Sequence, residues 1–116
     1  MRFSAFVRLT IAAAALTASS LATAAFPDKP IRIVIGFPAG GPLDQHARLL
    51  TDKLQAVLGQ PILVDYKSGA GGTVGAQEVM KAAPDGYTLM LANTGVMVIN
   101  PALYSKLPYQ TLRDFT

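Results

Sequence analysis

Two glycine-rich segments contain the residue types that could do chemistry in this chain. In Ile31–Asp44 (IRIVIGFPAGGPLD), an apolar β-branched run stops at a Pro/Gly turn, and a helix start with an early acid follows. Ile62–Gly72 (ILVDYKSGAGG) repeats the order of strand and glycine-rich loop. Helix starts expose unpaired N–H groups and the positive end of the helix dipole, so they attract anions. Two such loops after neighbouring parallel strands would face one crevice, which predicts a small-anion site built mainly from backbone donors.

The second loop does not fit a nucleotide-binding motif. Gly69 and Gly71 match the first two glycines of Gly-x-Gly-x-x-Gly, but the third position is Val74, and Gly75 comes one residue late. No acid that could bind a ribose lies about 20 residues after Gly69. The Gly-Lys-Ser/Thr of an ATPase phosphate loop is also missing at the helix start. We therefore expect no nucleotide site and no cofactor.

Few residues could support catalysis or metal binding. His46 is the single histidine, and it lies two positions after Asp44, so the two side chains do not face each other on a helix. One histidine, no cysteine and scattered acids cannot form a metal cluster, so no metal ligand is predicted. Asp44 could simply match the helix dipole, or it could order the donors of a ligand loop, with water or a ligand ammonium as its partner. A secreted hydrolase using Asp44 and His46 is the enzymatic alternative, and no catalytic residue is otherwise predicted.

The elements that must position these loops alternate between strands and helices. Strands are expected over residues 31–37, 62–65 and 87–92, and helices over residues 42–58, 73–83 and 96–100, with Pro101 ending the last helix. The predicted inner faces are Leu43, Ala47, Leu50, Leu54 and Val57 for the first helix, and Ala76, Val79, Met80 and Ala83 for the second. Residues 102–116 show no clear period and are expected to form a loop with at most one helical turn. The β-α-β-α-β order predicts an α/β fold with a parallel sheet.

Residues 1–24 resemble a cleaved signal peptide. Arg2 and Arg8 accompany a short apolar core over residues 9–16, and a small-residue Ala-Thr-Ala triplet ends at Ala24. Cleavage is expected after Ala24 or after Ala25, and a membrane anchor is the competing interpretation. Processing would remove two of the ten basic residues and lower the formal net charge from +3 to +1. Charge therefore gives no reason to expect a nucleic-acid or membrane-surface partner.

Five motifs that follow one another along residues 26–116 match the pattern of one family. They are Phe26–Arg32 (FPDKPIR), Phe37–Arg48 (FPAGGPLDQHAR), Leu58–Pro61 (LGQP), Gly69–Gly75 (GAGGTVG) and Ala82–Leu89 (AAPDGYTL). The ending Asn100–Tyr109 (NPALYSKLPY) with Asp114-Phe115 extends the match. The chain thus resembles the Bug receptors, the periplasmic substrate-binding components of tripartite tricarboxylate transporters.

The resemblance implies a type II periplasmic binding protein fold, in which two lobes close around a ligand. Residues 25–116 would be the incomplete first part of lobe one, with the second lobe absent. The implied ligand is a small carboxylate, which a monomeric receptor would deliver in the periplasm to membrane permease subunits, without enzymatic activity, cofactor or nucleic acid. Three loops would contact the ligand. They comprise Phe37, Pro38, Ala39, Gly40, Gly41 and Asp44; Ser68, Gly69, Ala70, Gly71, Gly72 and Thr73; and Asn93, Thr94 and Gly95.

The chain departs from the family pattern at several positions. Ala39 and Ser68 stand where the family often has proline, which would loosen both loops, although the Ser68 hydroxyl could add a donor. Leu43 replaces a smaller residue and is expected to pack inward, with contact to an apolar ligand body as the alternative. Because family members continue well past Thr116, we expect an N-terminal fragment, and a non-functional truncation product is the alternative.

Overall fold

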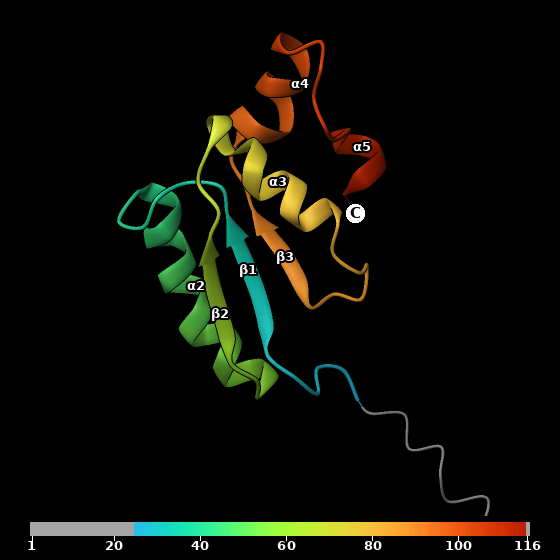
Figure 1. Cartoon of the computed structure of the whole chain (residues 1–116). Helices are drawn as coiled ribbons and strands as arrows, with labels where there is room; N and C mark the ends of the chain where they lie inside the picture. The colour runs from blue at the N-terminus through green and yellow to red at the C-terminus, as the bar shows by residue number, and fades with distance from the viewer. Residues whose placement is uncertain (1–24, 116) are drawn as a thin grey trace, which may run out of the picture.

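The computed structural model describes residues 25–115 and contains a three-stranded parallel sheet (Figure 1). The predicted signal peptide, residues 1–24, lies outside the described residues. The strands are β1 (Ile31–Ile35), β2 (Ile62–Tyr66) and β3 (Thr88–Leu91), in the order β2-β1-β3. The helical segments are α2 (Pro42–Leu58), the 3-10 turn η2 (Ala70–Gly72), α3 (Thr73–Met80), the π-helical turn η3 (Gly95–Ile99), α4 (Asn100–Leu103) and α5 (Thr111–Asp114). The predicted α/β fold with a parallel sheet is confirmed.

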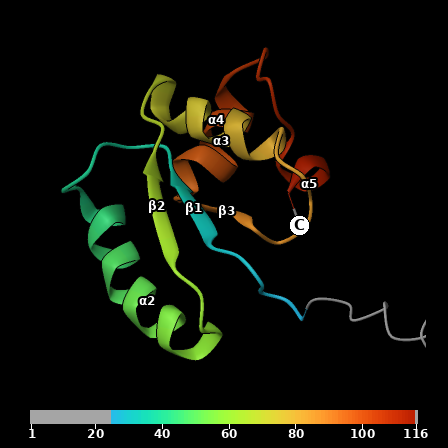
Figure 2. The ribbon, with the colours of Figure 1, turned by 60° about the horizontal axis from the view of Figure 1, so that its bottom comes forward.

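Helices cover both faces of the sheet. Helix α2 packs on one face, while α3 and the C-terminal segment pack on the other (Figures 1 and 2). Ile31, Ile33 and Ile35 of β1 point toward the α2 side and form one core cluster with Ala47. A second cluster, centred on Ala76, Val96 and Tyr109, fills the opposite side. Because β1 is the central strand and is buried on both faces, its apolar run is nearly continuous.

Helix α2 has the predicted bounds but a different buried face. Pro42 fits the first turn, and Gly59 ends the helix in a left-handed conformation (φ 67°) with its N–H on the Gln55 carbonyl. The prediction that Leu50 and Val57 face inward is wrong, since these residues are 46% and 82% exposed. Asp44, Ala47 and Thr51 are buried instead. The buried face of α2 is therefore rotated by about one residue from the predicted face. As a result, the polar first turn of the helix, with Asp44, lies against the sheet.

Several other boundaries differ from the predictions. Strand β1 stops at Ile35, because Gly36 leaves the ladder and packs against Gly72. Helix α3 ends at Met80, and Ala83 lies outside it and is exposed. Pro101 does not end the last helix but lies in the first turn of α4, where its missing N–H and fixed φ are tolerated. The tail, expected to be a loop with at most one helical turn, contains the turn α5, but its first residues, Ala102 and Leu103, belong to α4. No described helix has the length and apolar character needed to cross a bilayer.

Candidate functional site

The candidate site lies where the three strands end. Because the strands are parallel, the loops that follow β1, β2 and β3 leave from the same edge of the sheet (Figure 1). A pocket of about 420 Å³ opens there between the first and third loops. Its lining is Phe37, Pro38, Ala39, Gly41, Pro42, Leu43 and Asn93. Larger cavities of about 670 and 890 Å³ lie along β3 and along the C-terminal segment, away from the glycine-rich loops.

Apart from Thr94 and Gly95, the structure separates the predicted site residues into three groups. Five of them line the pocket: Phe37, Pro38, Ala39, Gly41 and Asn93. Gly40 and Asp44 belong to the first loop but do not line the pocket. The second loop, Ser68 to Thr73, also lies outside the lining, although a Cβ on Gly72 would come within 3.1 Å of the Phe37 ring. The second loop thus contacts the pocket wall from behind. Leu43 lines the pocket and also packs against the α2-side core. Both interpretations of this residue, inward packing and contact with an apolar ligand body, are therefore compatible with its position.

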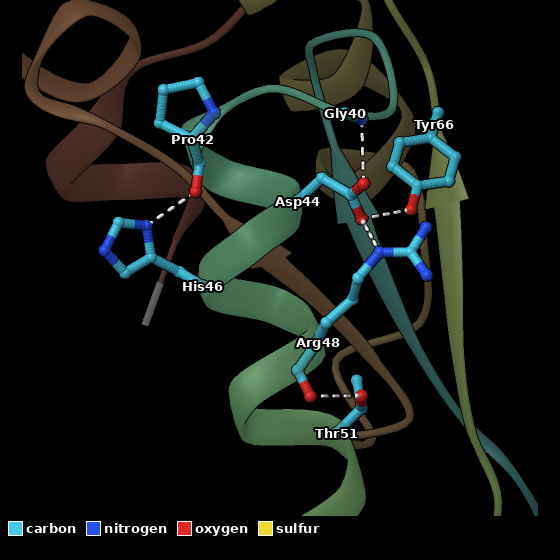
Figure 3. Close-up of polar contacts among 7 residues, drawn as sticks. All are labelled: Gly40, Pro42, Asp44, His46, Arg48, Thr51 and Tyr66. Atoms are coloured by element: carbon cyan, nitrogen blue, oxygen red, sulfur yellow. Dashed lines mark hydrogen bonds and ion pairs between the residues drawn. The ribbon is translucent and has the colours of Figure 1, made fainter.

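The Asp44 carboxylate anchors the first loop by a hydrogen bond to its backbone (Figure 3). Its side chain is only 3% exposed, and Oδ2 accepts the Gly40 N–H at 2.7 Å. Oδ1 accepts both the Arg48 Nε–H at 3.0 Å and the Tyr66 hydroxyl at 2.5 Å. Every partner of this carboxylate is therefore a donor from the protein. Of the two interpretations of Asp44, this geometry matches an acceptor that orders the loop.

The three side chains of this network shift one another's protonation. The Tyr66 hydroxyl, and then the Gly40 N–H, hold the pKa of Asp44 below its ordinary value, although burial opposes them. The hydrogen bond to Asp44, together with burial, raises the pKa of Tyr66. Asp44 also raises the pKa of Arg48. At neutral pH the network therefore consists of an ionised carboxylate, a protonated phenol and a guanidinium.

Tyr66 and Arg48 are functional candidates that the sequence analysis missed. Arg48 lies four residues after Asp44 on α2, a spacing that favours an ion pair and could have been recognised. Tyr66 reaches Asp44 only because β1 and β2 are paired in register, Ile35 beside Tyr66. His46 points away from this network, and its Nδ1 lies 2.6 Å from the Pro42 carbonyl oxygen (Figure 3). No group of three His, Cys, Asp or Glu side chains converges within residues 25–115.

The second loop presents exposed backbone donors. Ser68, Gly69, Ala70 and Gly71 are exposed, and their N–H groups have no protein acceptor within the described part of the chain. Ala70, Gly71 and Gly72 follow one another at positive φ (47°, 61° and 89°). A positive φ costs conformational energy at Ala70, whereas the two glycines adopt it readily. Successive backbone N–H groups without a protein acceptor can form an anion-binding concavity.

Gly72 has a packing role that the sequence did not reveal. A Cβ there would lie 2.5 Å from the Val96 Cγ2, so the position accepts only glycine. Gly36 and Gly75 meet in the same way, since a Cβ on Gly75 would lie 2.8 Å from the Cα of Gly36. These glycines bring the second loop against the end of β1. The Gly-rich motif therefore joins two functions, close packing at Gly72 and Gly75 and donor exposure at Gly69 to Gly71.

The third loop supplies one pocket residue. Asn93 is exposed and lines the pocket, and its Oδ1 accepts the Val96 N–H at 3.1 Å. Thr94 precedes η3 and Gly95 begins it, and neither residue lines the pocket. Asn93 therefore both starts the π-helical turn and borders the candidate site.

Comparisons with known proteins identify relatives of this arrangement. Residues 46–116 match the family described as "Tripartite tricarboxylate transporter family receptor". The chain is 37% identical over 114 residues to Protein BugT of Bordetella pertussis, covering 97% of this chain and 35% of that protein. MatC from Rhodopseudomonas palustris, solved with bound malate, is 44% identical with a TM-score of 0.75, over 78% of this chain and 31% of that one. A second R. palustris protein, solved with adipate, is 33% identical with a TM-score of 0.75, over 78% of this chain and 30% of that one. The chain spans 27% to 35% of the length of the curated relatives it matches.

Proposed function

This chain belongs to the tripartite tricarboxylate transporter receptor family, and we propose that its strand-end loops bind the carboxylate group of a small organic acid. The observation that carries the proposal is the run of exposed N–H groups from Ser68 to Gly71, which have no acceptor among residues 25–115. Two relatives of similar fold were solved with malate and with adipate, both of which are dicarboxylates. Backbone donors at strand ends suit such an anion.

In the proposed site, hydrogen-bond donors would bind the carboxylate of the ligand and apolar side chains would contact its carbon skeleton. Donors would come from Gly41 and from Ser68, Gly69, Ala70 and Gly71, with Asn93, Thr94 and Gly95 closing the third side. Gly40, Gly72 and Thr73 would border the ligand, since their own N–H groups already donate to Asp44, Gly69 and Ala70. Each charge-assisted hydrogen bond to a carboxylate is worth about 1.5–3 kcal/mol before desolvation costs. Phe37, Pro38, Ala39 and Leu43 line an apolar wall that suits the carbon skeleton of the acid.

Asp44 contributes to the proposed site without touching the ligand. Its carboxylate is fully engaged by Gly40, Arg48 and Tyr66, and a second anion beside it would be repelled. By holding the Gly40 N–H, it fixes a loop that Ala39, in place of a proline, would otherwise leave more mobile. Pre-ordering of this kind reduces the entropy lost when a ligand binds.

The remaining parts of the proposal concern the cellular setting. Receptors of this family are periplasmic binding proteins rather than enzymes. We place this chain in the periplasm after cleavage near Ala24, as a monomeric receptor that passes its ligand to the membrane permease subunits. No catalytic residue, cofactor or metal is part of the proposal.

Amide-resolved NMR titration of the 116-residue chain tests the carboxylate site. Malate and adipate should shift the amide resonances of Gly40, Gly41 and the Ser68–Thr73 loop, and the corresponding uncharged diamides should not. Resonances at the distant end of α2, near Gly59, serve as an internal control. Shifts that are absent, or that occur equally with the diamides, would exclude the carboxylate site. A chain that unfolds without cooperativity would favour the alternative of a non-functional product.

A further inference from the structure

A π-helical turn, η3, lies beside the second loop and is followed closely by a proline. In η3 the Asn100 N–H donates to the Gly95 carbonyl, five residues back, which is the π-helical pattern. The next residue, Pro101, has no N–H, so it cannot donate to Val96, five residues back, or to Met97, four residues back. Residue 101 therefore supplies no hydrogen bond to either of these two neighbouring carbonyl groups.

Two hydroxyl groups from the C-terminal segment occupy these carbonyls. The Tyr109 hydroxyl donates to the Val96 oxygen at 2.5 Å, and this contact is buried. The Thr111 Oγ1 donates to the Met97 oxygen at 2.8 Å. Tyr109 and Thr111 thus supply donors to two carbonyl groups that residue 101 cannot serve. The π-helical register is consequently supported by tertiary contacts and places the following residue, Asn100, in a defined position.

Asn100 uses that position to contact the second loop. It is buried, with 8% of its surface exposed, and its Nδ2 donates to the Gly71 carbonyl oxygen at 3.1 Å. Val96, which lies four residues earlier, packs on Gly72. Gly71 is the middle residue of the left-handed run from Ala70 to Gly72. Glycine-rich backbone has many competing conformations, and an external hydrogen bond that selects one of them reduces this freedom.

We propose that Asn100 is a positioning residue for the second loop: its amide holds the Gly71 peptide so that the loop keeps its N–H groups available to a ligand. The ligand part of this inference rests on the proposed carboxylate site. Asn100 acts through Gly71 and does not line the pocket. Its role parallels that of Asp44, which holds the Gly40 N–H of the first loop.

Asn100→Leu tests this role, because leucine has a similar size, fits a helix and cannot donate a hydrogen bond. The matched control is Gln55→Leu, which removes another bond between a side-chain amide and the backbone, the 3.2 Å contact of Gln55 Oε1 with the Ile62 N–H. That bond lies at the opposite end of the sheet. Three quantities are compared in the 116-residue chain: the melting temperature, the amide resonances and exchange rates of Ser68 to Gly72, and the affinity for malate.

In Asn100→Leu we expect altered resonances at Ala70 and Gly71 and faster exchange of the Gly72 N–H, which donates to the Gly69 oxygen. We also expect an affinity for malate reduced about tenfold, the ratio that corresponds to one lost hydrogen bond. Gln55→Leu should keep the wild-type loop resonances and affinity. Loop resonances that are unchanged in Asn100→Leu, or changed equally in Gln55→Leu, would overturn the proposal. If Asn100→Leu does not fold, the same measurements are made on Asn100→Ala, with the same expected results.

The loop measurement separates this inference from the proposed function. If the wild-type chain binds no dicarboxylate and the loop still responds to Asn100→Leu, the carboxylate site is refuted and the positioning of the loop is supported. If malate binds the wild-type chain and Asn100→Leu with equal affinity, the carboxylate site stands and Asn100 has no positioning role in binding.

Discussion

The Tyr66 hydroxyl, at the end of β2, donates to the Oδ1 of Asp44 in the first turn of α2 at 2.5 Å. The other oxygen of the same carboxylate receives the Gly40 N–H. Because the second glycine-rich loop begins directly after Tyr66, one buried carboxylate anchors both candidate ligand loops. The loops are therefore coupled beneath the site, whether or not a ligand bridges them above it.

Tyr66→Phe should raise the pKa of Asp44 toward its ordinary value, because the Tyr66 hydroxyl is the largest influence that lowers it. An NMR titration of the Asp44 carboxyl carbon in both proteins measures the change. Tyr87→Phe is the matched control, since Tyr87 donates to a different carboxylate, Asp28, at 2.5 Å. An Asp44 pKa that is the same in the wild type and in Tyr66→Phe would show that the hydroxyl does not stabilise the charge.

The stability that Asp44 provides should disappear in acid. Its pKa is lower in the folded chain than the ordinary 3.8, so the ionised carboxylate stabilises the folded state at pH values above 3.8. This contribution is lost as the pH falls from 3.8 through the lower folded value. The difference in melting temperature between the wild type and Asp44→Asn should thus be constant from neutral pH to about pH 5 and shrink below about pH 4. A difference that persists unchanged to about pH 2 would contradict the assigned direction.

Local signals in the sequence predicted the frame of the site. Pro42 and Gly59 bracket α2 as expected, and the alternation of apolar runs with glycine-rich turns gave the parallel β-α-β-α-β order. These features depend on neighbouring residues, because a proline fits a first helical turn and a glycine fits a left-handed helix end. The position of Asp44 beside the first loop follows from the same local rules.

The remaining features depend on contacts between distant segments. Tyr66 reaches Asp44 across 22 positions, and Asn100 reaches Gly71 across 29. Pro101 was expected to end a helix, but it lies in the first turn of α4, and Tyr109 and Thr111 donate to the carbonyls of the preceding turn. Neither strand register nor a π-helical turn can be predicted from local periodicity, which explains why these residues were missed.

Gly36→Ala should destabilise the chain strongly. The new Cβ would lie 2.8 Å from both the Cα and the carbonyl oxygen of Gly72, and backbone atoms in a packed loop cannot move aside as a side chain can. Overpacking of this kind costs about 1–3 kcal/mol of unfolding free energy or more. Gly41→Ala is the control, because its Cβ would meet only the Pro38 oxygen at 3.5 Å, and its effect should stay within about 0.5 kcal/mol. Urea unfolding measures the free energy of unfolding of both variants. Equal values would disprove close packing between the end of β1 and the second loop.

Tyr109→Phe should cost about 1–3 kcal/mol of unfolding free energy, the penalty for leaving a buried acceptor unpaired. Tyr109 is only 2% exposed, and Phe retains the ring that packs edge-on against Phe115, so the change isolates the hydroxyl bond to the Val96 carbonyl. Tyr104→Phe, at a position that is 59% exposed, should be nearly neutral. Urea unfolding measures both changes. Pro101 has no N–H that could replace the lost hydroxyl, so a neutral Tyr109→Phe would mean that the π-helical turn does not need this tertiary support.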